Sequence, residues 1–230
     1  MKDPNNYKIH RLRVIHLYEA DYSLLLAIHW RKTLHQAEDH RMLNPGTFGS
    51  RPNKSALTPV FLEELMLEIT RLARKNLIMF DNDAKSCYDR IIASIMSIIS
   101  RSYGASRSVV IVWAKTLQEA KFYLKTGKNV TDDFFTHSDA HPIHGSGQGA
   151  TNSPCGWLFI SSKLFDVYDE HASGATFISP DRSHAITIYM IGFVDDTKSQ
   201  VNSFLQNPQP SIADLTNIMQ KDAQLWNDLL

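Results

Sequence analysis

The residues best suited to metal chemistry in this chain are carboxylates that follow apolar runs. Asp83 comes just after a short apolar run, with Asp81 in front of it, and the pair Asp195-Asp196 interrupts the β-branched run 185–194. Neighbouring carboxylates repel one another unless a cation lies between them, so the pair invites a divalent metal ion. Carboxylates at two adjacent strand ends can hold two Mg²⁺ ions about 3.5–4 Å apart, as nucleotidyl transfer requires. A polar hairpin turn is the alternative, because Asp is common in turns.

Strands and helices must bring these carboxylates together. Residues 77–80 predict a short strand that ends in an acidic turn, followed by a long Ile-rich helix from Asp89. Residues 185–194 predict a strand and 197–201 its hairpin partner, with the Asp-Asp pair at the tip. The other expected elements are a strand at 8–17, a loop at 44–53 and helices at 21–36, 59–73, 109–125, 153–171 and 211–230.

Glycine is concentrated at one place in the chain. Of only 10 glycines, three alternate at Gly145, Gly147 and Gly149, just before the helix expected at 153–171. Such clustering marks a segment where the backbone turns sharply or is approached closely.

The composition sets the broad class. With 230 residues, 43% hydrophobic and 21% charged, the chain can bury a sizeable core, and long disorder is excluded. No run approaches the roughly 18 apolar residues of a membrane span, and the N-terminus has no apolar signal core. The two cysteines, Cys87 and Cys155, cannot build a disulfide framework, which fits a cytoplasmic or nuclear protein.

The net charge of zero conceals two halves of opposite sign. Residues 1–128 carry 20 Lys and Arg against 12 Asp and Glu, whereas residues 129–230 carry 4 against 12. A basic half can hold a polyanion while clustered carboxylates bind cations, although a solvated surface of mixed sign gives the same counts.

Three segments carry a family resemblance. Residues 80–89, Phe-Asp-Asn-Asp-Ala-Lys-Ser-Cys-Tyr-Asp, resemble the first palm motif of reverse transcriptases, with Asp83 as the metal-binding residue and Tyr88 as the aromatic five positions later. Residues 145–154 are similar to the second motif, Gly-x-x-Gln-Gly-x-x-x-Ser-Pro, and residues 193–196 to the third, aromatic-x-Asp-Asp. The three occur in the order of the family, and together they are specific.

The resemblance extends beyond these motifs and is closest to non-LTR elements. Residues 13–17 with 21–22 are similar to a fingers strand, 48–55 to the segment before the palm, and 223–226 to the start of the next palm motif. The sequence departs from the family at Asp81 and Asn82, Ser86-Cys87, and Phe193, where Tyr or Ala is usual.

The resemblance implies a role for each matching residue. Asp83 and Asp195 are expected to ligate two Mg²⁺ ions, with Mn²⁺ possible, and Asp196 to be a nearby ligand. The ring of Tyr88 is expected to exclude a ribose 2′-hydroxyl, with a core aromatic as the alternative.

Further residues are expected to bind the nucleotide. Gln148 and Gly149 match positions that contact it, although flexible glycines before a helix are the alternative. Arg13 is expected to clamp the triphosphate, with Arg11 and Lys8 as second candidates and a solvated strand face as the alternative.

The implied fold is α+β, a right-hand polymerase palm whose antiparallel sheet is backed by helices. Fingers are expected at 1–75 and 105–143 and the palm at 76–104 and 144–230. Because the chain stops inside the helix 211–230, we expect a fragment that lacks the thumb.

The implied function is RNA-directed DNA polymerisation in a retrotransposon, with an RNA template, a DNA or RNA primer and dNTPs as partners and no membrane. An RNA-dependent RNA polymerase is an alternative, but Cys155 stands where its second motif has Asn, and Tyr88 favours deoxynucleotides. The other alternative is a non-catalytic relic that binds nucleic acid. Zinc binding by the spaced residues His137, His141 and His144 is disfavoured without cysteines or a helical frame.

Overall fold

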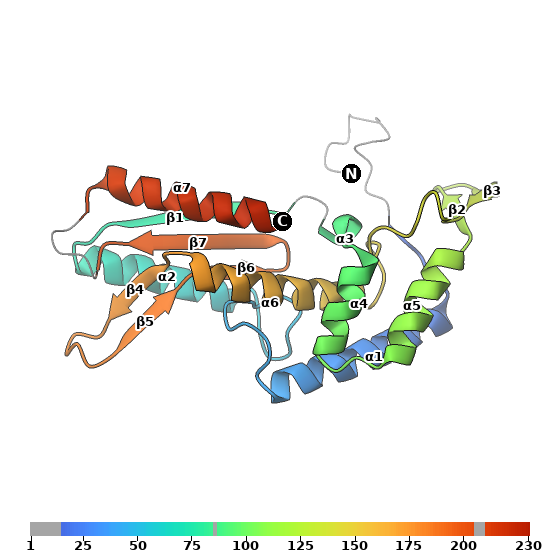
Figure 1. Cartoon of the computed structure of the whole chain (residues 1–230), viewed down its shortest axis with the longest axis horizontal. Helices are drawn as coiled ribbons and strands as arrows, with labels where there is room; N and C mark the ends of the chain where they lie inside the picture. The colour runs from blue at the N-terminus through green and yellow to red at the C-terminus, as the bar shows by residue number, and fades with distance from the viewer. Residues whose placement is uncertain (1–14, 85–86, 205–209) are drawn as a thin grey trace. The chain divides into compact units, whose positions relative to one another are not determined.

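The computed structural model describes residues 15–84, 87–204 and 210–230, and Figure 1 traces the chain. Two compact units alternate along it. The helical unit joins the described residues up to Thr33 to Tyr88–Gly156, and the sheet unit joins Leu34–Cys87 to Trp157–Leu230. Within the described residues, no helix is long and apolar enough to cross a bilayer.

This division into units does not test the fingers expected at 1–75 and 105–143 or the palm expected at 76–104 and 144–230. The assignment of either unit as fingers or palm stays a prediction.

The sheet unit is built on an antiparallel sheet in the order β1-β7-β6. A second antiparallel pair, β4 with β5, belongs to the same unit. The elements are α2 (Leu57–Leu72), β1 (Leu77–Asp83), α6 (Ser153–His171), β4 (Ala175–Ile178), β5 (Ala185–Ile188), β6 (Met190–Phe193), β7 (Asp196–Asn202) and α7 (Ile212–Leu229).

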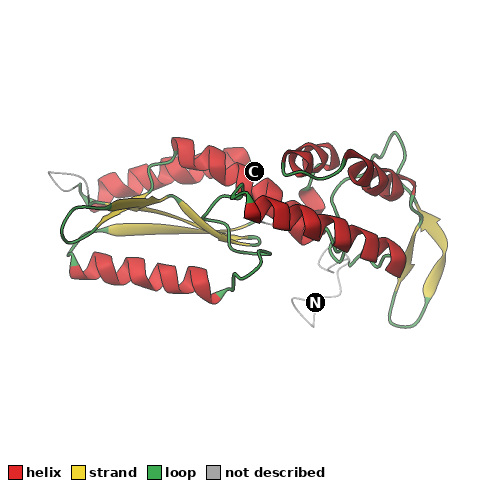
Figure 2. Cartoon of the chain, turned by 90° about the horizontal axis from the view of Figure 1, so that it is seen from below, coloured by secondary structure: helices red, strands yellow, loops and turns green. Residues whose placement is uncertain are grey.

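Helices cover both faces of this sheet, and apolar side chains of its strands pack against them on each side. Met66 of α2 packs with Ile191 on one face. On the other face, Val201 packs with Leu215 of α7 and Met190 packs with Phe165 of α6. Figure 2 shows strands with helices on either side. The sheet is therefore the middle layer of three, which holds its strand ends in place.

The helical unit contains four helices and one hairpin among its described residues. Its core includes Trp30 and Trp113, which lie edge to face with ring centroids 6.0 Å apart. Tyr22 donates its hydroxyl hydrogen to the carbonyl of Trp113. The elements are α1 (Ala20–Asp39), which continues beyond this unit, α3 (Cys87–Arg90), α4 (Ala93–Ser102), α5 (Arg107–Glu119), β2 (Phe122–Lys125) and β3 (Val130–Phe135).

The α+β class with antiparallel sheets is confirmed, and so are most of the predicted helices. Helices α1, α2, α6 and α7 lie where they were expected, and β6 and β7 form the predicted hairpin. Serine at position 211 and Asp214 form a capping box, which explains why α7 begins at Ile212.

Several expectations about elements are wrong. The expected helix 109–125 ends at Glu119, because Ala120 is extended and Phe122–Lys125 pairs with Val130–Phe135 as a hairpin. The helix expected from Asp89 is two helices, α3 and α4. The run 185–194 is split between two sheets, because β5 pairs with β4, a strand that was not predicted.

The N-terminal strand expected at 8–17 is described only from residue 15, and Ile15–Leu17 has no regular structure. Residues 8–14 lie outside the described residues. The acidic turn expected after residue 80 is also wrong, because β1 continues through Asp83 with every residue paired to β7. Backbone pairing extends the strand past the point where its side chains become polar.

Candidate active site

Three carboxylates meet at one end of the β1-β7-β6 sheet. Asp83, the last residue of β1, is the direct cross-strand partner of Asp196, the first residue of β7. Asp195 lies in the turn that precedes Asp196, and its carbonyl accepts a hydrogen bond from the backbone N–H of Ala84, with N and O 3.0 Å apart. The structure therefore brings Asp83 together with Asp195 and Asp196, which are far from it in sequence. We call Asp83, Asp195 and Asp196 the carboxylate group.

Negative charge is concentrated in the carboxylate group. Burial, and then repulsion from Asp195 and Asp83, with a further contribution from Asp81, raise the pKa of Asp196 above its usual value. Among the described residues, no basic side chain forms an ion pair with any member of the group. A cation placed here would relieve this repulsion.

Asp81 has a different role. It is the direct cross-strand partner of Lys198 in β7, whose Nζ is 3.1 Å from the Asp81 carboxylate. Lys198 also pairs with Glu63 of α2. Burial is the largest single influence on Lys198 and opposes its charge, but these two carboxylates together raise its pKa. Asp81 is thus neutralised by an ion pair, whereas no basic side chain in the described part of the chain pairs with Asp83, two residues on.

The donor set of the carboxylate group fits Mg²⁺ in chemistry. Mg²⁺ prefers carboxylate oxygens, commonly from one or two side chains, with water and substrate oxygens completing its shell. In the part of the chain that is described, no three His, Cys, Asp or Glu side chains form a ready-made metal cage. What the group offers is carboxylate oxygens, the ligand type that Mg²⁺ prefers.

The glycine segment belongs to the helical unit, and the structure explains its glycines. Gly145, Gly147 and Gly149 all have positive φ, at 80°, 75° and 105°. A Cβ on Gly147 would lie 2.8 Å from the His16 ring and from the Tyr18 hydroxyl. Side chains are thus excluded by backbone conformation and by close packing, as expected for a segment that is closely approached.

Two predicted nucleotide-binding residues are linked through this segment. The backbone N–H of Ser146 donates to the carbonyl of Tyr88 at 2.9 Å, and that of Gly145 donates to Ile91 at 2.8 Å. The carbonyl of Gln148 accepts a hydrogen bond of 2.6 Å from the backbone of His16. Tyr88 and Gln148 are half-buried and Gly149 is exposed. The helical unit therefore holds Tyr88 close to the glycine segment.

Two groups of residues predicted from the sequence are not placed at the carboxylate group or at the glycine segment. Arg13, with its alternatives Arg11 and Lys8, lies outside the described residues. Among the histidines weighed for zinc, His137 packs edge-on against the ring of Phe122, and His144 shares a 2.8 Å hydrogen bond with the carbonyl of Asp89.

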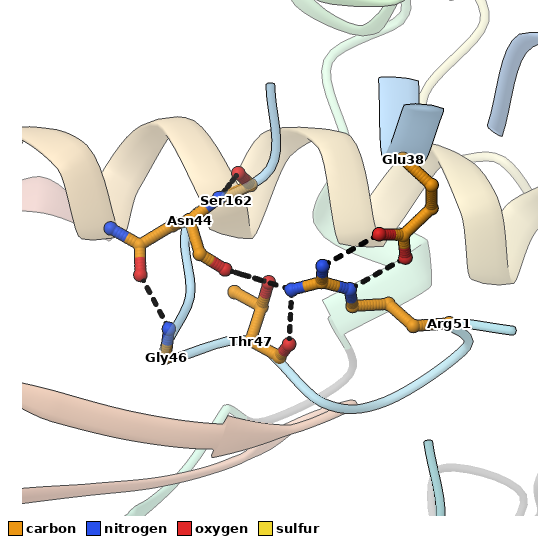
Figure 3. A network of polar contacts seen from close by, with 6 residues as sticks. All are labelled: Glu38, Asn44, Gly46, Thr47, Arg51 and Ser162. Carbon is orange, nitrogen blue, oxygen red and sulfur yellow. Dashed lines mark hydrogen bonds and ion pairs between the residues drawn. The ribbon is translucent and has the colours of Figure 1, made fainter. Parts of the chain in front are cut away.

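A polar network fixes the loop 44–53 of the sheet unit, as Figure 3 shows. Arg51 forms a two-pronged ion pair with Glu38, with both N–O distances 2.7 Å. Its remaining terminal nitrogen donates to the carbonyls of Asn44 and Thr47 at 3.0 and 2.9 Å. Because these bonds engage all three guanidinium nitrogens, Arg51 is committed to holding the loop rather than a phosphate.

This loop lies against the β6-β7 hairpin, which carries Asp195 and Asp196. The backbone N–H of Gly192 in β6 donates to Gly46, and Phe48 donates to Gly192, both at 2.8 Å. The side chain of Asn44 donates to Asp166 and Asp169 of α6 at 3.1 and 2.9 Å. Loop, hairpin and α6 are thus joined by hydrogen bonds within one unit.

Several residues around the carboxylate group were missed by sequence reasoning. Lys198 and Glu63 are polar residues within ordinary amphipathic segments, so nothing in the sequence distinguishes them as an ion pair. Trp157 donates its indole N–H to the carbonyl of Val194, just before Asp195, at 2.6 Å. Its place four residues after Ser153 in the second motif was the only available signal.

Comparisons with known proteins give a structural likeness only. No protein-family model matches the chain, and no curated protein matches it. It is similar to apo telomerase from Candida tropicalis, truncated from its C-terminal domain, with a TM-score of 0.49 and 13% identity over 89% of this chain and 36% of that one. It is also similar to telomerase from Candida albicans in complex with a fragment of telomeric RNA, with a TM-score of 0.42 and 12% identity over 89% and 32% of the two chains. The chain spans about a third of the length of these structures, and similarity at this level assigns neither a family nor an activity to it.

Proposed function

We propose that this chain is a reverse-transcriptase-type polymerase domain that carries out RNA-directed DNA synthesis in a retrotransposon of the non-LTR kind. The observation that carries the proposal is the register of β1 with β7, which makes Asp83 and Asp196 direct partners with Asp195 in the adjoining turn. The first and third motifs are 112 positions apart at these residues, yet their carboxylates meet at one sheet end. Unrelated turn carboxylates have no reason to meet in this way.

The carboxylate group would hold two Mg²⁺ ions through its side-chain oxygens, with Asp83 and Asp195 as the shared ligands. Two bound ions supply charge neutralisation at the α-phosphate of the incoming nucleotide and at the attacking primer hydroxyl. The uncompensated charge of the group supports this role, because no described basic residue satisfies these carboxylates. Asp81, paired with Lys198, is assigned no metal.

The glycine segment would bind the nucleotide. Its backbone can be approached closely because Gly149 is exposed and bears no side chain. Gln148 is tied to His16 through its carbonyl, so its side-chain amide remains the group that would face a ligand. Tyr88 would set the choice of sugar through its ring, and Arg13 would bind the triphosphate.

The partners in this proposal are an RNA template, a DNA or RNA primer and dNTPs. The experiment that tests it is primer extension on an RNA template by the protein that contains these residues, with Mg²⁺ or Mn²⁺. Asp195→Asn is expected to abolish extension, and Asp228→Asn, an exposed carboxylate on α7, is the matched control. Extension with ribonucleotides alone would favour an RNA polymerase. Metal binding or nucleic-acid binding without extension would favour a non-catalytic relic.

A further inference from the structure

The turn that presents Asp195 contains a strained residue. Val194 and Asp195 connect β6 to β7, whose flanking residues Phe193 and Asp196 are cross-strand partners. Val194 has φ of 60°, whereas Asp195 has no positive φ, the pattern of a type II′ hairpin turn. Glycine is favoured at this first central position because it has no Cβ to clash at positive φ. A β-branched side chain such as that of valine is strongly disfavoured there. Val194 therefore keeps its conformation only if its surroundings hold it.

Two features of the sheet unit hold Val194 in place. The indole N–H of Trp157, a side chain that is 7% exposed, donates to the Val194 carbonyl at 2.6 Å. Gly49 also packs against Val194, so closely that a Cβ there would collide with the backbone nitrogen of Val194 and lie 2.8 Å from its Cγ2. The strained peptide is thus held by a short hydrogen bond and by steric confinement.

The hydrogen bond of Trp157 is not a general property of the buried tryptophans. Trp30, Trp113 and Trp226 have indole nitrogens without a partner among the described residues. Of the four tryptophans in the chain, Trp157 is the one whose N–H is directed at a backbone carbonyl next to the carboxylate group. This contrast points to a role beyond filling the core.

We propose that Trp157 is a positioning residue that locks Val194 in its left-handed conformation and so fixes Asp195 and Asp196 opposite Asp83. The effect of Trp157 on metal binding rests on the proposed function, whereas its effect on the turn does not. If the hydrogen bond is lost, Val194 can relax to negative φ, which rotates the peptide that joins it to Asp195. The carboxylates would then lose the arrangement set by the β1-β7 register.

The test compares Trp157→Phe with Trp226→Phe, a second buried tryptophan of the same unit that has no hydrogen bond to lose. Mn²⁺ binding is measured by electron paramagnetic resonance of the free ion. We expect Trp157→Phe to weaken Mn²⁺ binding about 5-fold, as loss of one hydrogen bond implies, and Trp226→Phe to leave it unchanged. Equal affinities of the two variants would overturn the proposal.

A rescue variant tests the conformational part. Glycine adopts positive φ without strain, so Val194→Gly should make Mn²⁺ binding insensitive to Trp157→Phe. The nuclear Overhauser effect between the amide and Hα protons of residue 194, which is strong at positive φ, reports the turn directly. It should weaken in Trp157→Phe and persist in Trp226→Phe. A strong effect at Val194 in Trp157→Phe contradicts the proposal.

Two further arms keep the outcomes distinct. If Trp157→Phe does not fold, replacement of Trp157 by benzothienylalanine retains the bicyclic ring and removes only the N–H, and the same losses are expected. If the unsubstituted protein binds no Mn²⁺ that Asp195→Asn removes, the proposed metal function fails. The Overhauser measurement on residue 194 still decides whether Trp157 holds the turn.

Discussion

Asp83 and Asp196 face each other across β1 and β7, at the point where one strand ends and the other begins. This pairing concentrates negative charge at one sheet end, because Asp195 adjoins it and no described basic residue compensates it. Two directly opposed carboxylates weaken a sheet in the absence of a cation. The same arrangement that is unfavourable for folding is suitable for metal binding.

The first prediction concerns the pH dependence of this repulsion. Burial and neighbouring carboxylates raise the folded-state pKa of Asp196 above the ordinary value of 3.8. A raised carboxyl pKa means that ionisation destabilises the fold: the penalty is absent well below pH 3.8 and fully present above the folded-state pKa. Without divalent cations, Asp196→Asn should therefore be more stable than the unsubstituted chain near pH 7, by less than about 1 kcal/mol in the free energy of unfolding, since the side chain is exposed.

This difference between Asp196→Asn and the unsubstituted chain should vanish at low pH, where both carry a neutral side chain. Added Mg²⁺ should reverse it near pH 7, because the unsubstituted chain offers the ion one more carboxylate and is stabilised more by binding it. Thermal unfolding followed by circular dichroism measures both effects. A variant that is less stable at pH 7 without metal would contradict the repulsion.

The second prediction concerns the ion pairs of Lys198. Lys198→Met keeps the aliphatic length but leaves Glu63 and Asp81 without their cation, in a position where the side chains of Lys198 and Glu63 are 23% and 28% exposed. We expect a loss of about 1–2 kcal/mol in the free energy of unfolding, measured by urea titration. Lys115→Met is the control, because its pair with Glu119 is exposed, at 69% and 66%, and is worth about 0.5 kcal/mol or less. Equal losses of unfolding free energy in the two variants would show that the ion pairs of Lys198 stabilise the fold no more than an exposed pair does.

The third prediction concerns the space at Gly49. Gly49→Ala would place a methyl group against the backbone of Val194, which also accepts a hydrogen bond from Trp157. We expect a loss of about 1–3 kcal/mol in the free energy of unfolding, since backbone must move to accept it. Gly127→Ala is the matched control, because nothing lies within 4 Å of a Cβ at that position. If both substitutions are neutral in urea titrations, the close approach of Gly49 to Val194 is not as tight as described.

The fourth prediction concerns sugar choice and depends on the proposed function. Tyr88→Ala should allow ribonucleotides into primer extension while Mn²⁺ binding stays unchanged, because Tyr88 bears no charge and the carboxylate group lies in the sheet unit. Tyr88→Phe, which keeps the ring, should retain selection for deoxynucleotides. Loss of all extension together with a destabilised fold would identify Tyr88 as a packing residue, whose removal costs about 3–5 kcal/mol.

Much of the candidate site was predictable because its signals are local. Asp83, Asp195, Asp196 and the glycine segment lie in short motifs. The apolar run 185–194 and the alternation at 197–201 sufficed to predict the β6-β7 hairpin, and the helical pattern behind the glycines sufficed to predict α6. The split of the run 185–194 was not predictable, because β5 and β6 have equally apolar sequences and differ only in which strand pairs with each.

What the sequence determined by itself was the supply of chemical groups: three carboxylates, a glycine-rich segment and an aromatic at fixed spacings. Only the tertiary structure decided which carboxylates are available. Asp81 and Asp83 are equivalent in sequence and, being two positions apart, lie on the same face of β1, but the direct cross-strand partner of Asp81 is Lys198 whereas that of Asp83 is Asp196. The strained conformation of Val194 was likewise hidden, because it is imposed by Trp157 and Gly49, which meet Val194 only when the unit is folded.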